Sequence, residues 1–211
     1  FDYLAHEILD QQDAPVRDFL LATGMLDRFS ASLCDAVTGR EDSQAMLAQL
    51  EAANLFIVPL DQRRRWYRYH HLFSDFLAAQ LTEEHSSAQI LELHRRASTW
   101  HEDHGYAADA IRHALAAEAY QRAATLIKRV TQEMFARSEL RTLLQWLTAL
   151  PASSLEADAF LSMTAAWAFL ATGQFEAVEP HVQAVEHLFG VTVDEVTDPT
   201  TLPDDVRGAL A

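Results

Sequence analysis

The sequence predicts a mainly α fold, in which a winged-helix domain with one β-hairpin precedes a superhelical array of antiparallel helix pairs. The 211 residues include only six glycines and six prolines, with alanine and leucine dominant between them, which favours long helices. A β-branched apolar run at 55–60 and an aromatic run at 66–69 flank a polar stretch, as strands flank a turn. Gly105 and Gly173 lie 68 positions apart, which is two periods of the 34-residue tetratricopeptide helix pair.

Capping residues delimit the first helices. Pro15 suits the first turn of a helix, where its missing N–H would have no partner, and Gly24 can end that helix. Ser30 is a typical N-cap, and Gly39 follows the helix that Ser30 begins. We therefore expect helices over residues 15–23, 31–37 and 43–54.

A hairpin and a further helix complete the first domain. The strands over 55–60 and 66–69 enclose a turn that carries the arginine run 63–65. The next helix, over 71–80, places Leu72, Phe73, Phe76 and Leu77 on one face. Helices followed by a hairpin make a winged helix over residues 1–82, with the arginine run at the wing tip.

The charge distribution argues against nucleic-acid binding by this chain. With 16 basic and 31 acidic residues, the formal net charge is −15. The helix best placed for a recognition role, 43–54, contains Glu51 and no Lys or Arg, whereas reading DNA requires cationic and donor side chains. Residues 151–211 hold ten acidic residues and one base, Arg207. That end is either a solvated acidic face with a loop or a surface that faces a basic partner.

The single cysteine, Cys34, excludes an internal disulfide and fits a reducing cytoplasm. The sequence has no apolar stretch of eighteen residues and no leader pattern, so we expect no membrane insertion and a cytoplasmic location. Phe1 is not an initiator Met, and the residues after it already have a helical pattern. We expect the chain to be part of a longer protein.

One segment resembles a known family. The sequence 66–77, Trp-Tyr-Arg-Tyr-His-His-Leu-Phe-Ser-Asp-Phe-Leu, with the segments 33–39 and 54–56, is similar to the winged helix of MalT-type LuxR-family transcriptional regulators, in the STAND class of signalling ATPases. The resemblance implies an upstream ATPase module that the winged helix locks in its ADP state. It also implies a histidine that contacts the β-phosphate of the nucleotide. That histidine aligns with His70, while His71 replaces the Asp of the family motif.

Two interpretations of His70 stay open. A histidine beside a helix N-terminus can donate to a phosphate, and the amide dipoles there favour an anion. Alternatively, His70 and His71 simply begin a helix after a strand. His71 fits the second interpretation better.

The second domain, 83–211, repeats small or apolar residues at fixed offsets from its turns. Ser138 takes the turn position between Gly105 and Gly173. The apolar stripes predict six helices in antiparallel pairs, ending near Gly190, with the last carrying Phe175, Val178, Val182 and Val185. Pro180 should kink that helix. We expect a loop over 192–201, the start of a helix near 202–207, and further repeats. By resemblance, the repeats are the sensor platform.

Two side-chain groups suggest other chemistry. His94, His101, His104 and His113 are candidate metal ligands, although their spacing misses the i, i+4 histidine pair of zinc proteases and surface histidines explain them better. The four tryptophans, at 66, 100, 146 and 167, either form an aromatic ligand site or, as we prefer, pack between helices. We assign no catalytic and no metal-binding residue.

We therefore expect a non-catalytic regulatory segment of an ATP-dependent activator, with no cofactor of its own and with ATP or ADP bound by the parent protein. Its expected partners are the ATPase and DNA-binding domains of that parent, a small-molecule or protein effector on the repeats, and further copies of the protein. The alternative is a tetratricopeptide-type adaptor unrelated to transcription. A metal enzyme is a more distant alternative.

Overall fold

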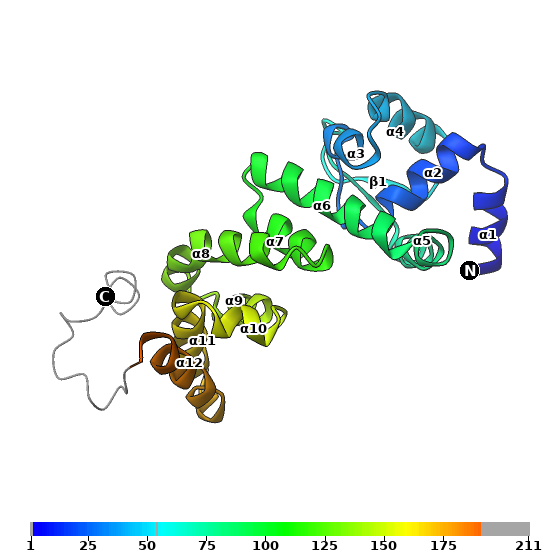
Figure 1. The fold of residues 1–211 in the computed structure, drawn as a ribbon. Helices are drawn as coiled ribbons and strands as arrows, with labels where there is room; N and C mark the ends of the chain where they lie inside the picture. Colours follow the sequence, from blue (N-terminus) through cyan, green and yellow to red (C-terminus); the bar gives the residue numbers. More distant parts are fainter. Residues whose placement is uncertain (1, 54, 191–211) are drawn as a thin grey trace. The chain divides into compact units, whose positions relative to one another are not determined.

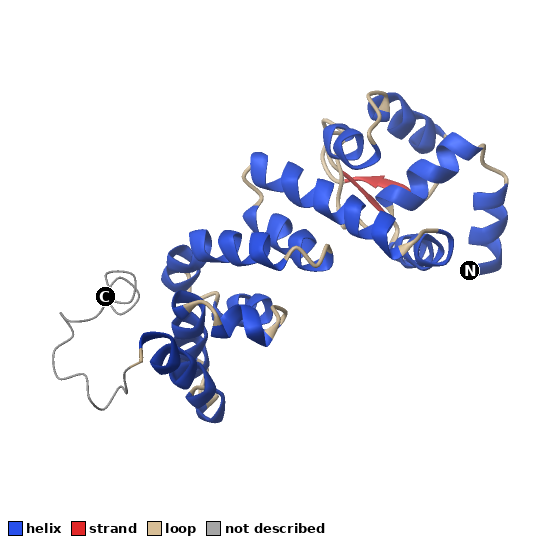
Figure 2. Ribbon diagram, viewed as in Figure 1, coloured by secondary structure: helices blue, strands red, loops and turns tan. Residues whose placement is uncertain are grey.

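The computed structural model describes residues 2–53 and 55–190. Within these residues, twelve α-helices and one two-stranded antiparallel hairpin form two compact units that divide after Tyr106 (Figures 1 and 2). The expected mainly α class, with its single hairpin, is confirmed. The loop expected over 192–201 and the helix expected near 202–207 lie outside the described residues.

The first unit, which ends at Tyr106, has the element order of a winged helix. Its elements are α1 (Asp2–Asp10), α2 (Ala14–Thr23), α3 (Ala31–Thr38), α4 (Ser43–Ala52), β1 (Ile57–Pro59), β2 (Tyr67–Tyr69), α5 (His71–Glu84) and α6 (Ser87–Asp103). Helix α6 packs against α3 and belongs to this compact unit. The domain boundary between 82 and 83 stays a prediction.

The expected caps are present, but the two glycines serve different purposes. Ser30 Oγ accepts a hydrogen bond from the amide of Leu33 at the start of α3. Gly39 ends α3 with a φ of 75°, a left-handed conformation that favours glycine. Gly24, in contrast, has a φ of −61°. A Cβ on Gly24 would lie 2.5 Å from Leu77 Cβ, so Gly24 allows α2 and α5 to pack closely.

Aromatic side chains dominate the core of the first unit. Phe29, Tyr67, Tyr69 and Phe73 are all buried, with the Phe29 and Tyr69 rings 4.6 Å apart and the Tyr69 and Phe73 rings 5.8 Å apart. The Tyr69 hydroxyl is 2.7 Å from Thr23 Oγ1, so its polar group is paired inside the core. This core connects the hairpin to both α2 and α5.

Helix α5 corrects one sequence prediction. Phe73, Phe76, Leu77 and Leu81 are buried along one stripe, whereas Leu72 is 42% exposed. Residues at i, i+3, i+4 and i+8 already complete the buried face, and Leu72 lies one residue outside it. The placement of Leu72 on the core face was therefore wrong.

The second unit begins at Ala107, and its described residues, 107–190, form helices. Its elements are α7 (Ala107–Ala116), α8 (Tyr120–Ala136), α9 (Leu140–Thr148), α10 (Ala152–Glu156), α11 (Ala159–Ala171), the 3₁₀ turn η1 (Phe175–Ala177) and α12 (Glu179–Phe189). Helix α7 packs mainly on α8 and α11 mainly on α12, while α9 packs on both α8 and α11. The short α10 was not predicted. No helix in the described ranges is long and apolar enough to cross a membrane.

The predicted repeat turns share one backbone conformation. Gly105, Ser138 and Gly173 have φ values of 78°, 58° and 77°, so even the serine adopts the left-handed region. Several of the small or apolar residues predicted near these turns are fully buried, among them Ala110, Leu143 and Ala165. The turn positions and these packing positions of the repeat are therefore confirmed.

The last helix corrects the expectation for Pro180. Helix α12 begins at Glu179, so Pro180 lies in its first turn, where the missing N–H breaks no hydrogen bond and no kink is needed. Phe175 belongs to η1 and is 69% exposed, so its predicted place on the buried stripe was wrong. Gly190 ends α12 with a φ of 64°, as expected.

Candidate functional site

The wing turn between β1 and β2 is held by one carboxylate. Asp61 accepts hydrogen bonds from the backbone amides of Arg63, Arg65 and Trp66, at 2.8 to 3.3 Å. Desolvation opposes ionisation of Asp61, but these hydrogen bonds keep its pKa below the usual value. The turn is therefore ordered by its own backbone, while its arginine side chains remain exposed.

The hairpin separates a buried face from a basic outer face. The register pairs Val58 with Arg68, and both side chains are exposed, whereas Tyr67 and Tyr69 point into the core. Because side chains alternate along a strand, His70 continues the outer face that Arg68 begins. Sequence reasoning missed Arg68. The alternation of the aromatic run, with tyrosines on either side of Arg68, is the signal that predicts its outward position.

His70 lies where the hairpin meets α5. Its backbone N–H donates to Phe56 O at 2.8 Å, and its carbonyl accepts from the amides of Phe73 and Ser74, both at 2.9 Å. It is the N-cap residue of α5, but its side chain makes no capping hydrogen bond. The exposed ring of His70 lies 4.5 Å from that of His71, measured between centroids. The backbone is thus fixed on both sides, and the imidazole faces solvent.

This arrangement has the chemistry of an anion site. The first amides of a helix have no intrahelical acceptor, and the helix dipole favours negative charge there. The exposed side chains of Arg68 and His70 stand beside that end of α5. A phosphate at this position would meet main-chain N–H groups and the His70 imidazole. The predicted role of His70 stays a prediction.

The tryptophans and histidines of the first unit form a packing cluster. The Arg28 guanidinium lies 5.0 Å from the Trp66 ring centroid and 5.3 Å from that of Tyr106. Trp100 stacks on His104 at 3.9 Å and on Tyr106 at 5.9 Å. These contacts support the packing interpretation for Trp66 and Trp100.

The remaining candidates lie elsewhere. Of the other two tryptophans, Trp146 is buried, as in the packing interpretation, while Trp167 on α11 is 44% exposed. His101 belongs to the first unit and His113 to the second, and both are buried. Over the described ranges, no three His, Cys, Asp or Glu side chains are grouped so that they could hold a metal ion. Cys34 is buried in α3, and its burial raises the pKa of the thiol, as expected for a packing residue.

The order of helices, hairpin and helix, with an exposed histidine at the start of α5, defines a winged-helix module that is followed by paired helices. Residues 5–89 match the MalT winged helix domain, and this part of the chain belongs to that family. The match includes the hairpin, His70 and the start of α6. The chain is therefore MalT-like, as the sequence predicted.

Two curated relatives extend the similarity into the second unit. The HTH-type transcriptional regulator MalT of Klebsiella pneumoniae is 34% identical over 193 residues, which is 92% of this chain and 21% of that protein. The serine/threonine-protein kinase PknK of Mycobacterium tuberculosis is 35% identical over 167 residues, which is 79% of this chain and 15% of the kinase. The chain thus spans about a fifth or less of these relatives.

Proposed function

We propose that this chain is the non-catalytic regulatory segment of a cytoplasmic, ATP-dependent transcriptional activator of the LuxR family and STAND class. Its winged helix holds an ATPase module of the parent protein in the ADP state. Its second unit, as the beginning of a tetratricopeptide-type superhelix, takes an effector. Effector and nucleotide bias the position of the winged helix, and release of that domain allows self-association of the parent.

One observation carries the nucleotide part of the proposal. His70 is exposed at the N-cap of α5, beside amides that have no intrahelical acceptor. Its backbone is fixed by the hydrogen bond to Phe56 and by the first turn of α5. An imidazole N–H on this rigid base can donate to the β-phosphate of ADP. Arg68, on the same outer face, adds positive charge for a nucleotide.

DNA binding is assigned to another part of the parent protein. Helix α4 has no Lys or Arg with which to contact phosphates or base edges. The chain as a whole carries a formal charge of −15, which opposes association with a polyanion. We therefore assign DNA binding to a C-terminal helix-turn-helix of the parent.

One finding favours a second kind of full-length protein, a kinase, as the parent of this chain. The similarity to a protein named a serine/threonine kinase covers 79% of this chain. The same segment therefore suits a regulatory role in a kinase. A tetratricopeptide-type adaptor is the third possibility. The reading frame of the parent distinguishes them: a phosphate-binding Walker motif upstream and a helix-turn-helix downstream support the activator, a kinase domain supports the second parent, and neither supports the adaptor.

Substitution of His70 tests the nucleotide contact in the full-length parent protein. We expect His70→Ala to weaken ADP binding about tenfold, because a hydrogen bond to a charged phosphate is lost. Basal activation should rise in the same variant. Dissociation of a fluorescent ADP analogue measures the first effect, and effector-independent transcription measures the second.

His71→Ala is the matched control, because His71 is the adjacent exposed imidazole. We expect it to leave ADP release unchanged. His70→Asn should retain part of the affinity, since an amide can still donate to phosphate. If His70→Ala binds ADP as tightly as the wild type, the proposed contact is wrong.

A further inference from the structure

A cavity of about 550 Å³ opens in the first unit, on the side of α6 that faces α2 and the end of α3. This volume is within the range of small-molecule sites. The cavity is separate from the proposed nucleotide contact. His70 precedes α5 and His85 follows it, and the fourteen residues of this helix span about 21 Å.

Two guanidinium groups on the cavity wall have unused donors. Arg40 donates from Nε and Nη2 to the two carboxylate oxygens of Asp42, at 2.7 and 2.8 Å. Arg96 donates from Nε to Glu92 at 3.0 Å and from Nη1 to Val37 O at 3.2 Å. A guanidinium has five N–H groups, so each arginine keeps three without a partner among the described residues. Paired guanidinium donors of this kind suit a carboxylate.

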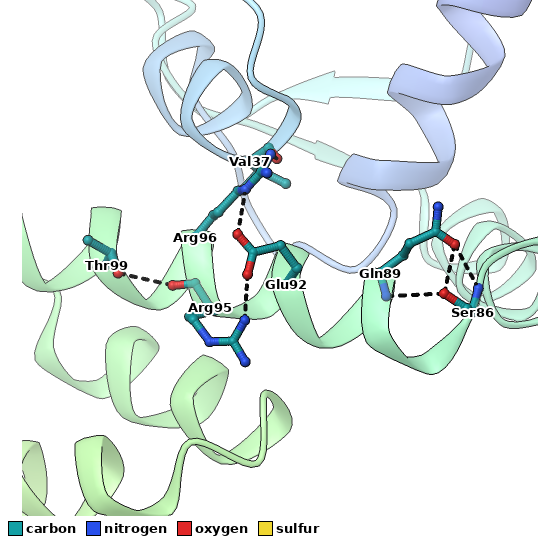
Figure 3. A network of polar contacts seen from close by, with 7 residues as sticks. All are labelled: Val37, Ser86, Gln89, Glu92, Arg95, Arg96 and Thr99. Carbon is teal, nitrogen blue, oxygen red and sulfur yellow. Dashed lines mark hydrogen bonds and ion pairs between the residues drawn. The ribbon is translucent and has the colours of Figure 1, made fainter.

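Arg96 is held by two hydrogen bonds, and each oxygen of Glu92 accepts from an arginine (Figure 3). The two Glu92 oxygens accept from Arg96 and Arg95, which come from the following turn of α6. Through Val37 O, Arg96 also satisfies a carbonyl at the end of α3. The charge of Glu92 is therefore balanced by Arg95 and Arg96.

A histidine that follows α5 lines the same cavity. His85 lines it, and His85 Nδ1 is inaccessible to solvent and has no hydrogen-bond partner among the described residues. A buried polar atom without a partner is costly, and such atoms mark places where a ligand or water completes the structure. A peptide amide or carbonyl in the cavity can pair with this nitrogen once the His85 ring turns towards the cavity.

The cavity lining also includes one carboxylate and apolar side chains. Asp18, on α2, is exposed and has no ion pair among the described residues. Phe19, Ala22 and Leu93 contribute apolar atoms next to it. A purely anionic ligand would be repelled by Asp18. A ligand with an ammonium group as well as a carboxylate satisfies both Asp18 and the arginines.

We propose that this cavity binds a small zwitterion with an apolar body, of the size of a di- or tripeptide. Arg40 and Arg96 bind its carboxylate, Asp18 binds its ammonium group, and His85 Nδ1 pairs with its backbone. Because the site joins α2 and α3 to α6, the bound peptide holds α6 against the winged helix. This is a second ligand site, additional to an effector site on the repeats.

The test uses the full chain, ¹⁵N-labelled, titrated with the dipeptide Leu-Leu and observed by NMR. We expect saturable shifts confined to residues that line the cavity, with a dissociation constant in the millimolar range or tighter. N-acetyl-Leu-Leu lacks the ammonium group and Leu-Leu amide lacks the carboxylate. Each should bind about tenfold more weakly, since each loses a charge-assisted contact.

Two variants localise the binding. Arg40→Ala and Asp18→Asn should each weaken Leu-Leu about tenfold. Arg63→Ala and Glu7→Gln, which are exposed and away from the cavity, should not. Far-UV circular dichroism checks that every variant is folded.

Three results would overturn the proposal. The first is the absence of saturable shifts with Leu-Leu up to about 10 mM. The second is binding that Arg40→Ala and Asp18→Asn leave unchanged. The third is that inorganic phosphate binds more tightly than Leu-Leu and that Asp18→Asn increases the affinity for phosphate. That result would define an anion site. None of these results bears on ADP release by His70 variants, so the two proposals fail independently.

Discussion

The two units of the chain are stabilised in different ways. The first has one core, in which aromatic side chains from the hairpin, α2 and α5 meet residues distant in sequence. The second also has one core, but it buries mainly alanine and leucine, and its most extensive helix pairs, α7 with α8 and α11 with α12, are consecutive in sequence. A defect should therefore spread through the whole first unit but stay local in the second. A single rigid core also suits a domain that moves as one body.

Removal of a core ring should have the largest effect. Phe73 is fully buried and contacts the rings of Phe56, Tyr69 and Phe76. We expect Phe73→Ala to lower the unfolding free energy of the first unit by about 3–5 kcal/mol. Native-state hydrogen exchange should show lost protection throughout that unit.

Leu143→Ala is the matching substitution in the second unit, because Leu143 is also fully buried. We expect Leu143→Ala to lower the unfolding free energy of the second unit by about 2–5 kcal/mol. Loss of hydrogen-exchange protection should be limited to α9 and the helices that pack on it. The comparison fails if Leu143→Ala removes protection along the entire second unit, or if Phe73→Ala affects α5 alone.

Alkaline pH should destabilise the first unit selectively. Burial raises the pKa of Cys34, so the folded state keeps the thiol neutral, while the unfolded chain releases that proton at about pH 8.5. The contribution of the neutral Cys34 thiol to the free energy of unfolding is fully present below about pH 8.5, and it decreases as the pH rises above that value. By pH 10 the loss is about 2 kcal/mol. The chain has one cysteine, so the second unit lacks this effect.

Urea unfolding between pH 7 and pH 10 measures this loss of stability of the first unit, with Cys34→Ala as the control. That variant loses some packing at every pH, but its stability should fall less steeply towards pH 10. Equal slopes for the variant and the wild type would show that the thiol does not titrate as described. Above pH 10, Tyr69 adds to the loss, since burial raises its pKa in the folded state.

The smallest effect is expected at the repeat turns. Ser138 is exposed and has a φ of 58°, which is unfavourable for a residue with a Cβ. Ser138→Gly should raise the stability of the second unit by up to about 1 kcal/mol. Gly173→Ala should lower it by about 1 kcal/mol, although nothing lies within 4 Å of the added Cβ. Thermal unfolding measures both changes, and the same sign for both would contradict this explanation.

Local signals in the sequence were sufficient for much of the fold. The Ser30 cap, the Gly39 end and the repeat turns depend on the residue and its immediate neighbours, and each prediction was confirmed. Pro180 was misjudged because the start of α12 depends on the preceding turn η1. Leu72 was misjudged because its burial depends on which face of α5 meets α2.

In the candidate site, too, some features follow from local sequence and others depend on the tertiary structure. The position of His70 at the start of a helix follows from the motif and the hairpin, and sequence reasoning found it. The outward direction of Arg68 required the register of the hairpin. The cavity beside α6 could not be predicted, because Arg40, His85 and Arg96 come from segments that only the tertiary fold brings together.

The hydrogen bond from Arg96 to Val37 O joins residues 59 positions apart, and this has a consequence for synthesis on the ribosome. At about 5–20 residues per second, Arg96 is polymerised about 3–12 s after Val37. During that interval the end of α3 lacks the cation that completes it, and the face that α6 covers is open. The nascent chain therefore passes through a period in which chaperones have access to α3.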